Sequence, residues 1–267
     1  MQTAVLRMDE PDRSPHVLFK EDPTPLENHM TEAFARSPVC AIVGVGPGNG
    51  AAFVRRFANE GYRVAMIARS GEVMDALATE LPQARAYRCD VAEPAQVEGA
   101  FAAIAGDMGP VDALIYNAGK GVWGAVDEIS PQAFEEAWRI NAFGAFVAAK
   151  CVIPAMRAKG EGQIIFIGTT ASRRGGARTA AFASAKAAQR SLAESLARTY
   201  GPFGIHVSIV IIDGVVDEPR ARKQLADKPD DFFVKPEDIA DTLIMLCRQH
   251  RSAWSFELEA RPFGEAW

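Results

Sequence analysis

The chain has 267 residues, a formal net charge of −5, and 48% hydrophobic against 24% charged residues. This length can bury a large core without disulfide or metal support, and the composition is that of an ordinary globular protein. The acidic balance argues against a nucleic-acid surface. The longest apolar runs have strand length, far short of the ~20 residues that cross a membrane, so we expect no membrane association.

Four cysteines and four histidines lie scattered along the chain. No pair of them has the spacing of metal ligands, and no CxxC pair is present, so we expect neither a metal site nor a disulfide framework. Isolated cysteines of this kind suit a reducing compartment, which predicts a cytoplasmic protein.

Residues 1–36 differ from the rest of the chain. Four prolines punctuate a polar stretch without a sustained hydrophobic period, which predicts a flexible N-terminal arm. Docking of this arm on a partner subunit is the alternative. Residues 37–267 contain no Pro/Gly-rich linker and are expected to form one domain.

Strand-like and helical patterns alternate from residue 38 onward. The expected strands cover residues 40–44, 62–68, 84–89, 111–116, 163–167, 205–212 and 254–258. The expected helices cover residues 51–60, 71–81, 95–106, 131–159, 180–200 and 235–248. Apolar strands joined by helices indicate a parallel sheet covered on both faces. The prediction is a doubly wound, Rossmann-type α/β fold of about seven strands.

The first strand runs into a glycine-rich turn that opens a helix. Gly44, Gly48 and Gly50 follow the spacing G-x-x-x-G-x-G, with Asn49 between the last two glycines. Glycines permit a sharp turn and a close approach to a pyrophosphate, while the helix N-terminus offers free N–H groups. The turn predicts a dinucleotide site, and a glycine-rich turn without a ligand is the alternative.

The end of the second strand bears on the choice between NAD and NADP. An acidic residue there binds the adenosine ribose, whereas an arginine suits the 2′-phosphate. The chain has Arg69 and Ser70 at this point and no carboxylate. Paired charge-assisted hydrogen bonds from Arg69 favour NADP(H). A solvated charge at the entry of a helix is the alternative for Arg69.

Further motifs follow at recognisable intervals. They are Asp90 and Val91 after the third strand, Asn117, Ala118 and Gly119 after the fourth, Asn141 in a long helix, and Lys186 in the next long helix. Together with the glycine turn they resemble the short-chain dehydrogenase/reductase family from about residue 38 onward. The resemblance implies a nicotinamide-dependent oxidoreductase that acts on a small molecule and forms a homodimer or homotetramer. It also implies that Asp90 holds the adenine and Lys186 the nicotinamide ribose.

The expected catalytic positions are Asn141, Thr169, Phe182 and Lys186. Phe182 stands where the family has a Tyr thought to protonate the carbonyl oxygen, and a phenyl ring has no such proton. General acid–base help of this kind contributes roughly 10²–10⁴-fold. Thr169, thirteen positions earlier, stands where the family has a Ser, and its hydroxyl can hydrogen-bond a carbonyl.

The turn after the sixth strand also departs from the family pattern. Asp213 precedes Gly214 where the family has Pro-Gly, and Glu218 stands in place of a Thr. If Gly214 keeps its place beside the nicotinamide, Asp213 acts there as an acid or base, or it caps the following turn.

Three arginines, Arg173, Arg174 and Arg178, lie in the loop before Phe182. They predict an anionic substrate, and a solvated loop with scattered ion pairs is the alternative.

Two functions follow from these observations. The first is an NADP(H)-dependent oxidoreductase that moves hydride to or from a carbonyl, an alcohol or an activated alkene with an atypical proton donor. The second is a non-catalytic NADP(H)-binding protein with a regulatory or structural role.

Overall fold

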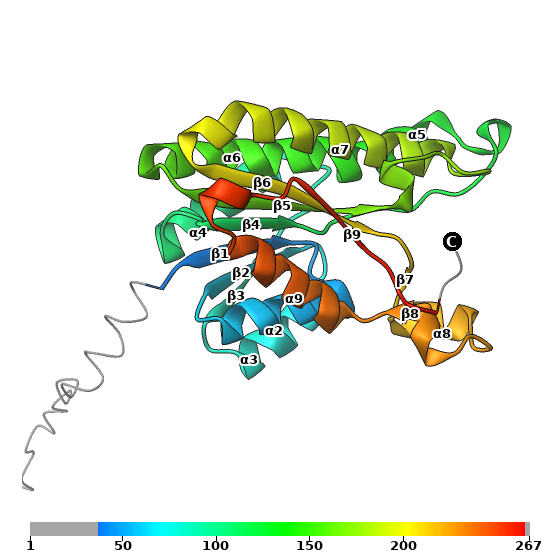
Figure 1. Ribbon diagram of the computed structural model, residues 1–267, viewed down its shortest axis with the longest axis horizontal. Coiled ribbons are helices and arrows are strands. Elements are labelled where there is room, and N and C mark those ends of the chain that lie inside the picture. The colour runs from blue at the N-terminus through cyan, green and yellow to red at the C-terminus, as the bar shows by residue number, and fades with distance from the viewer. Residues whose placement is uncertain (1–36, 265–267) are drawn as a thin grey trace, which may run out of the picture. The chain divides into compact units, whose positions relative to one another are not determined.

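A parallel β-sheet forms the centre of the computed structural model, which describes residues 37–264 (Figure 1). Its seven strands lie in the order β3-β2-β1-β4-β5-β6-β9, and every neighbouring pair is parallel. The strands are β1 (Val39–Val43), β2 (Arg63–Ala68), β3 (Ala84–Arg88), β4 (Ala113–Tyr116), β5 (Gly162–Thr169), β6 (Ile205–Ile212) and β9 (Glu257–Ala260). The strand order reverses between β1 and β4, which is where open α/β sheets bind ligands beyond the carboxyl ends of their strands.

Helices cover both faces of the sheet in Figure 1. One face carries α4 (Pro94–Met108), α6 (Gly144–Lys159) and α7 (Ala180–Tyr200), and the other carries α2 (Asn49–Asn59), α3 (Glu72–Glu80) and α9 (Pro236–Cys247). Two separate apolar clusters result, one on each face. Because strands β1, β4, β5 and β6 contribute alternate side chains to both clusters, apolar residues follow one another along them, and His206 and Ser208 of β6 are buried polar exceptions.

The predicted long helix over residues 131–159 is divided in the structure. It consists of α5 (Pro131–Trp138), a π-helical turn over Arg139–Phe143, and α6. Among the described residues this is the one helical stretch long and apolar enough to cross a membrane, but 61% of its most apolar window is buried inside the molecule. It therefore packs as a core helix.

The predicted fold class is confirmed, and the differences concern the ends of elements, the divided helix and a segment in which no element was predicted. The last strand begins three residues later than expected, at Glu257, where its pairing with Ile209 of β6 starts, and a short 3₁₀ turn at Arg251–Ala253 precedes it. Residues 215–234, for which the sequence predicts no element, contain α8 (Pro219–Gln224) and a small sheet of β7 (Val215–Val216) and β8 (Phe233–Val234). The predicted arm, residues 1–36, lies outside the described residues.

Within residues 37–264, no group of His, Cys, Asp and Glu side chains is arranged to hold a metal ion.

Candidate active site

The glycine-rich loop between β1 and α2 is fixed by close backbone contacts. Gly44 has φ 93°, and its N–H donates to the carbonyl of Ile67 at 2.8 Å. A Cβ on Gly44 would lie 2.6 Å from the Cα of Ala118, and one on Gly50 would lie 2.6 Å from the Cα of Val45. No side chain fits at either position, so the loop packs tightly against the neighbouring backbone.

The Asn117-Ala118-Gly119 segment forms the floor of this loop. The side-chain amide of Asn117 donates to the carbonyl of Gly44 at 2.7 Å, and the N–H of Asn117 donates to the carbonyl of Val43 at 2.8 Å. These bonds join the carboxyl ends of β1 and β4. The motif therefore fixes the glycine loop through hydrogen bonds from Asn117.

A hollow of about 280 Å³, which we call the adenosine hollow, opens beside this loop. Asp90 lines it and turns one carboxylate oxygen toward the N–H of Ala92, at 3.0 Å. The predicted cofactor residues that line the hollow are Gly44, Arg69, Ser70, Asp90, Val91, Asn117, Ala118 and Gly119. Most of the predicted cofactor set is thus gathered in one place.

Arg88 lies next to this hollow, and it is not among the predicted cofactor-binding residues. It ends β3 opposite Ala68 of β2, and its guanidinium crosses over Gly71, where an added Cβ would lie 2.9 Å from Cζ. A weak ion pair with Asp75, at 3.5 Å, holds it on the protein surface. Arg88 therefore places a second cation beside the segment that carries Arg69 and Ser70. A basic residue at the end of β3 was the available signal.

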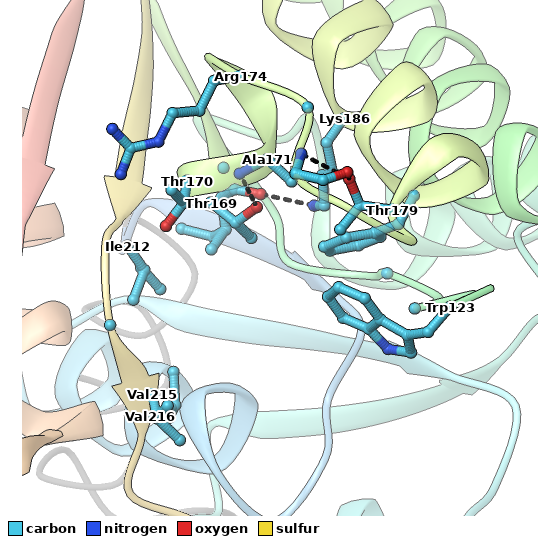
Figure 2. A pocket seen from close by; sticks show the side chains of 18 of the residues that line it. Trp123, Thr169, Thr170, Ala171, Arg174, Thr179, Lys186, Ile212, Val215 and Val216 are labelled. Carbon is cyan, nitrogen blue, oxygen red and sulfur yellow. Dashed lines mark hydrogen bonds between the residues drawn. The ribbon is translucent and has the colours of Figure 1, made fainter. Parts of the chain in front are cut away.

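A larger cavity of about 640 Å³ adjoins the adenosine hollow, and both are lined by Asn117 and Gly119 (Figure 2). We call it the substrate cavity. Its walls come from the end of β4, the segment 167–176, helix α7 and the segment 212–216. Thr169, Phe182, Lys186, Asn49 and Gly214 of the predicted site all line it.

Thr169 is held by a local hydrogen-bonded turn. Its hydroxyl accepts from the N–H of Ala171 at 3.1 Å, while its own N–H donates to the hydroxyl of Ser172 at 3.1 Å. The hydroxyl proton of Thr169 therefore remains available to an acceptor in the cavity.

Lys186 lies one turn after Phe182 on α7 and is buried. Its ammonium donates to the carbonyl of Ile167 at 2.9 Å and to the side-chain oxygen of Gln189 at 3.1 Å. Burial lowers the pKa of Lys186 from its ordinary 10.5 to about 8. Loss of hydration disfavours the charged form of a buried lysine, so this group exchanges a proton close to neutral pH.

Phe182 lines the substrate cavity together with Trp123. The ring packs against Trp123 with centroids 5.1 Å apart and planes inclined at 49°. An apolar pair of rings therefore stands beside Lys186.

Asn141 lies behind the cavity, in the π-helical turn. Its amide donates to the carbonyls of Ala137 at 2.8 Å and Lys120 at 2.9 Å. These bonds tie the turn to the loop after β4. Interruptions of this kind in α-helices are frequent at functional sites. The structure thus brings together three of the four predicted catalytic residues, with Asn141 supporting the loop that borders them.

Asp213 lies beside Thr170, whose hydroxyl donates to its carboxylate. The flanking residues Ile212 and Gly214 line the substrate cavity, whereas the side chain of Asp213 is engaged with Thr170. This bond joins the segment after β6 to the segment after β5.

The three predicted loop arginines do not act together. Arg173 forms ion pairs with Glu257, at 2.8 Å, and with Glu259, and Arg178 pairs with Glu128 at 2.7 Å. Arg174 lines the substrate cavity, and its side chain has no ion-pair partner within residues 37–264. Only one of the three guanidiniums is therefore free to meet a ligand.

Asn49, at the start of α2, has a buried side-chain oxygen without a hydrogen-bond partner in the described part of the chain. Leaving a buried acceptor unpaired is unfavourable, so the site is suited to a ligand that brings a donor. Together with the glycine loop and the adenosine hollow, this unpaired oxygen fits a nicotinamide dinucleotide.

Comparison with known proteins agrees with this geometry. A family profile described as short chain dehydrogenase matches residues 38–229. The chain is 30% identical to the 2-(R)-hydroxypropyl-CoM dehydrogenase of Xanthobacter autotrophicus, over 73% of this chain and 80% of that protein.

Two solved structures are also similar. A short-chain dehydrogenase from Rhodopseudomonas palustris is 32% identical, with a TM-score of 0.74 over 85% of this chain and all of that one. A variant of the actinorhodin polyketide ketoreductase, solved with NADPH, is 26% identical, with a TM-score of 0.78 over 85% of this chain and 97% of that one. The chain therefore belongs to the short-chain dehydrogenase family of oxidoreductases.

Proposed function

We propose that the protein is an NADP(H)-dependent oxidoreductase that moves hydride to or from a small carbonyl, alcohol or activated alkene without a tyrosine proton donor. The observation that carries this proposal is the shared cavity of Thr169, Lys186 and the phenyl ring of Phe182, which adjoins the adenosine hollow. The nicotinamide ring of the bound cofactor would supply or accept the hydride. The chain's own residues then have to bind the substrate oxygen and transfer one proton to or from the substrate.

The preference for NADP(H) rests on charge at the adenosine hollow. Arg69 and Ser70 line the hollow, and Arg88 lies over Gly71, the next residue. Guanidinium groups bind phosphate through paired, charge-assisted hydrogen bonds. The NADPH bound to the similar actinorhodin ketoreductase variant supports the same assignment.

In this proposal the Thr169 hydroxyl donates a hydrogen bond to the substrate oxygen, and Lys186 replaces the missing phenol as the proton source through water. A pKa of about 8 leaves Lys186 largely protonated at neutral pH and able to release its proton. For an activated alkene, solvent supplies the proton to carbon, and no acid is needed at Phe182.

The test is NADPH oxidation across a panel of aldehydes, ketones and enones, with Lys186→Met and Phe182→Tyr as variants. The proposal expects turnover by the wild-type protein and a loss of about 10²-fold or more in Lys186→Met, in line with general acid catalysis. Activity that falls in Phe182→Tyr would mark the phenyl ring as part of a working mechanism.

A non-catalytic NADP(H)-binding protein is the second candidate, favoured by the phenyl ring at 182 and by the engagement of Asp213 with Thr170. Tight NADPH binding without turnover on the whole panel supports it. Activity that appears only in Phe182→Tyr would then identify a competent pocket that lacks an acid.

We further propose that the protein is a homo-oligomer that associates through the α5–α6 surface. Trp138, Phe143 and Phe146 form a stacked ladder there, with centroid spacings of 5.6 and 6.3 Å, and Trp138 and Phe146 are 42% and 45% exposed. Exposed apolar surfaces of this kind mark interaction sites. Light scattering should find a smaller species for Trp138→Glu with Phe146→Glu than for Val126→Glu, an exposed control. Equal masses would contradict this interface.

A further inference from the structure

We propose that the substrate is an amphipathic organic acid, with an anionic group held by Arg174 and a flat apolar or aromatic group held by Trp123 and Phe182. Aryl-substituted oxo and hydroxy acids are the class that fits. This inference rests on the proposed oxidoreductase function and adds the chemical class of its substrate.

The charge of the substrate cavity supports the anionic group of the proposed substrate. Its lining includes Arg174 and Lys186 and no Asp or Glu side chain. Lys186 is buried and already bound to Ile167 and Gln189. Arg174 is the cation that remains without an ion-pair partner within residues 37–264, whereas its neighbours Arg173 and Arg178 are neutralised by glutamates. A guanidinium without an ion-pair partner, in a cavity whose lining has no carboxylate of its own, suits a carboxylate ligand.

The pair of Trp123 and Phe182 supports the flat apolar or aromatic group of the proposed substrate. Trp123 is 65% exposed although its ring rests on Phe182 at a centroid distance of 5.1 Å. A second ring packed on this pair would remove apolar surface from water and gain the additional energy of aromatic contacts. Phenylalanine at position 182 keeps this wall free of a polar group that would need a hydrogen-bond partner.

The reactive groups lie between these two features in Figure 2. Arg174 and Trp123 occupy opposite sides of the view, and Thr169 and Lys186 are seen between them. An oxo acid whose carboxylate meets Arg174 would therefore have its carbonyl on the side of Thr169 and its side chain on the side of Trp123. The cavity volume of about 640 Å³ is within the range of small-molecule sites.

Calorimetric binding to the protein saturated with NADP⁺ tests the inference without turnover, because an oxo acid and the oxidised cofactor cannot react with each other. Three probes separate the two features: phenylpyruvate carries both groups, phenylacetone lacks the carboxylate, and pyruvate lacks the ring. We expect phenylpyruvate to bind roughly 10- to 100-fold more tightly than either partial probe, the gain typical of a charge-assisted contact or a buried ring.

Matched variants assign each gain to its residue. Arg174→Gln should abolish the preference for phenylpyruvate over phenylacetone, while Arg178→Gln, whose side chain pairs with Glu128, should keep it. Trp123→Ala should reduce the preference for phenylpyruvate over pyruvate. Unchanged NADP⁺ affinity in each variant verifies that the fold is intact.

Three results overturn the inference: equal affinity for phenylpyruvate and phenylacetone, equal effects of Arg174→Gln and Arg178→Gln, or no effect of Trp123→Ala. A failure of the proposed function is seen separately, as absent binding of NADP⁺ by the wild-type protein or absent turnover of the carbonyl and enone panel with NADPH.

Discussion

The two halves of the site are built in different ways. The cofactor half, around the glycine loop, is defined by backbone: Gly44 and Gly50 lie against neighbouring main chain, and Asn117 bonds a carbonyl. The substrate half is defined by side chains from segments far apart in the sequence, such as Trp123, Arg174 and Val216. Backbone contacts leave little freedom for substitution, whereas a cavity lined by side chains can change its ligand one residue at a time.

This contrast predicts where a single change is most harmful.

Gly44→Ala should destabilise the protein by about 3 kcal/mol, because the positive φ is strained for alanine and the methyl group meets the backbone of Ala118. The melting temperature should fall by roughly 6–12 °C for a chain of this size. Gly46→Ala is the matched control, since nothing lies within 4 Å of its added Cβ. Similar melting temperatures for the two variants, measured without cofactor, would show that the loop is not held by backbone contacts.

Arg69→Gln should weaken binding of 2′,5′-ADP by roughly 10- to 100-fold while leaving 5′-ADP unaffected, because only the former carries the 2′-phosphate. Arg88→Gln should produce a smaller loss, since this guanidinium also pairs with Asp75. Arg85→Gln, on the same strand and exposed, serves as the control.

Titration calorimetry with both nucleotides measures these effects. A wild-type protein that binds 5′-ADP as tightly as 2′,5′-ADP would remove the assignment to NADP(H). Equal losses of affinity in the Arg88 and Arg85 variants would contradict only the role of Arg88 in binding the 2′-phosphate.

Lys186 should make stability depend on pH. Its pKa is about 8 in the folded protein against an ordinary 10.5, so below pH 8 both folded and unfolded chains carry the proton. Between pH 8 and 10.5 only the unfolded chain retains it, and the stability of the wild type therefore rises with pH in this window. Relative to Lys186→Met, the gain from pH 7 to pH 9 should be about 1 kcal/mol.

Urea unfolding of the two proteins at both pH values measures this difference. Parallel changes in the free energy of unfolding would mean that Lys186 is hydrated and that its pKa is not lowered.

The sequence predicts the place of the glycine loop between β1 and α2, for a physical reason. Strand and helix periods are local, and the glycines at 44 and 50 are required by contacts that recur wherever such a loop meets the next strand. The same reasoning missed Arg88, since its place opposite Ala68 depends on the register of β2 and β3. The division of residues 131–159 by a π-helical turn has no clear signal in the hydrophobic pattern.

The substrate half was predicted less completely because long-range pairing decides it. Thr169, Phe182 and Lys186 lie within eighteen residues, and their spacing on β5 and α7 brings them together. The role of each loop arginine depends instead on distant partners: Arg173 meets Glu257, 84 residues away. Sequence alone did not tell which guanidinium stays free.

The last strand, β9, holds the loop after β5 in place through ion pairs. Glu257 of β9 pairs with Arg173 in the cavity rim and with Arg190 of α7, and Glu259 also binds Arg173. The loop that follows β5 is thus anchored by two glutamates of β9. Proteolytic loss of β9 would therefore release Arg173 and loosen the substrate cavity, while the glycine loop would keep its contacts with Ile67 and Asn117.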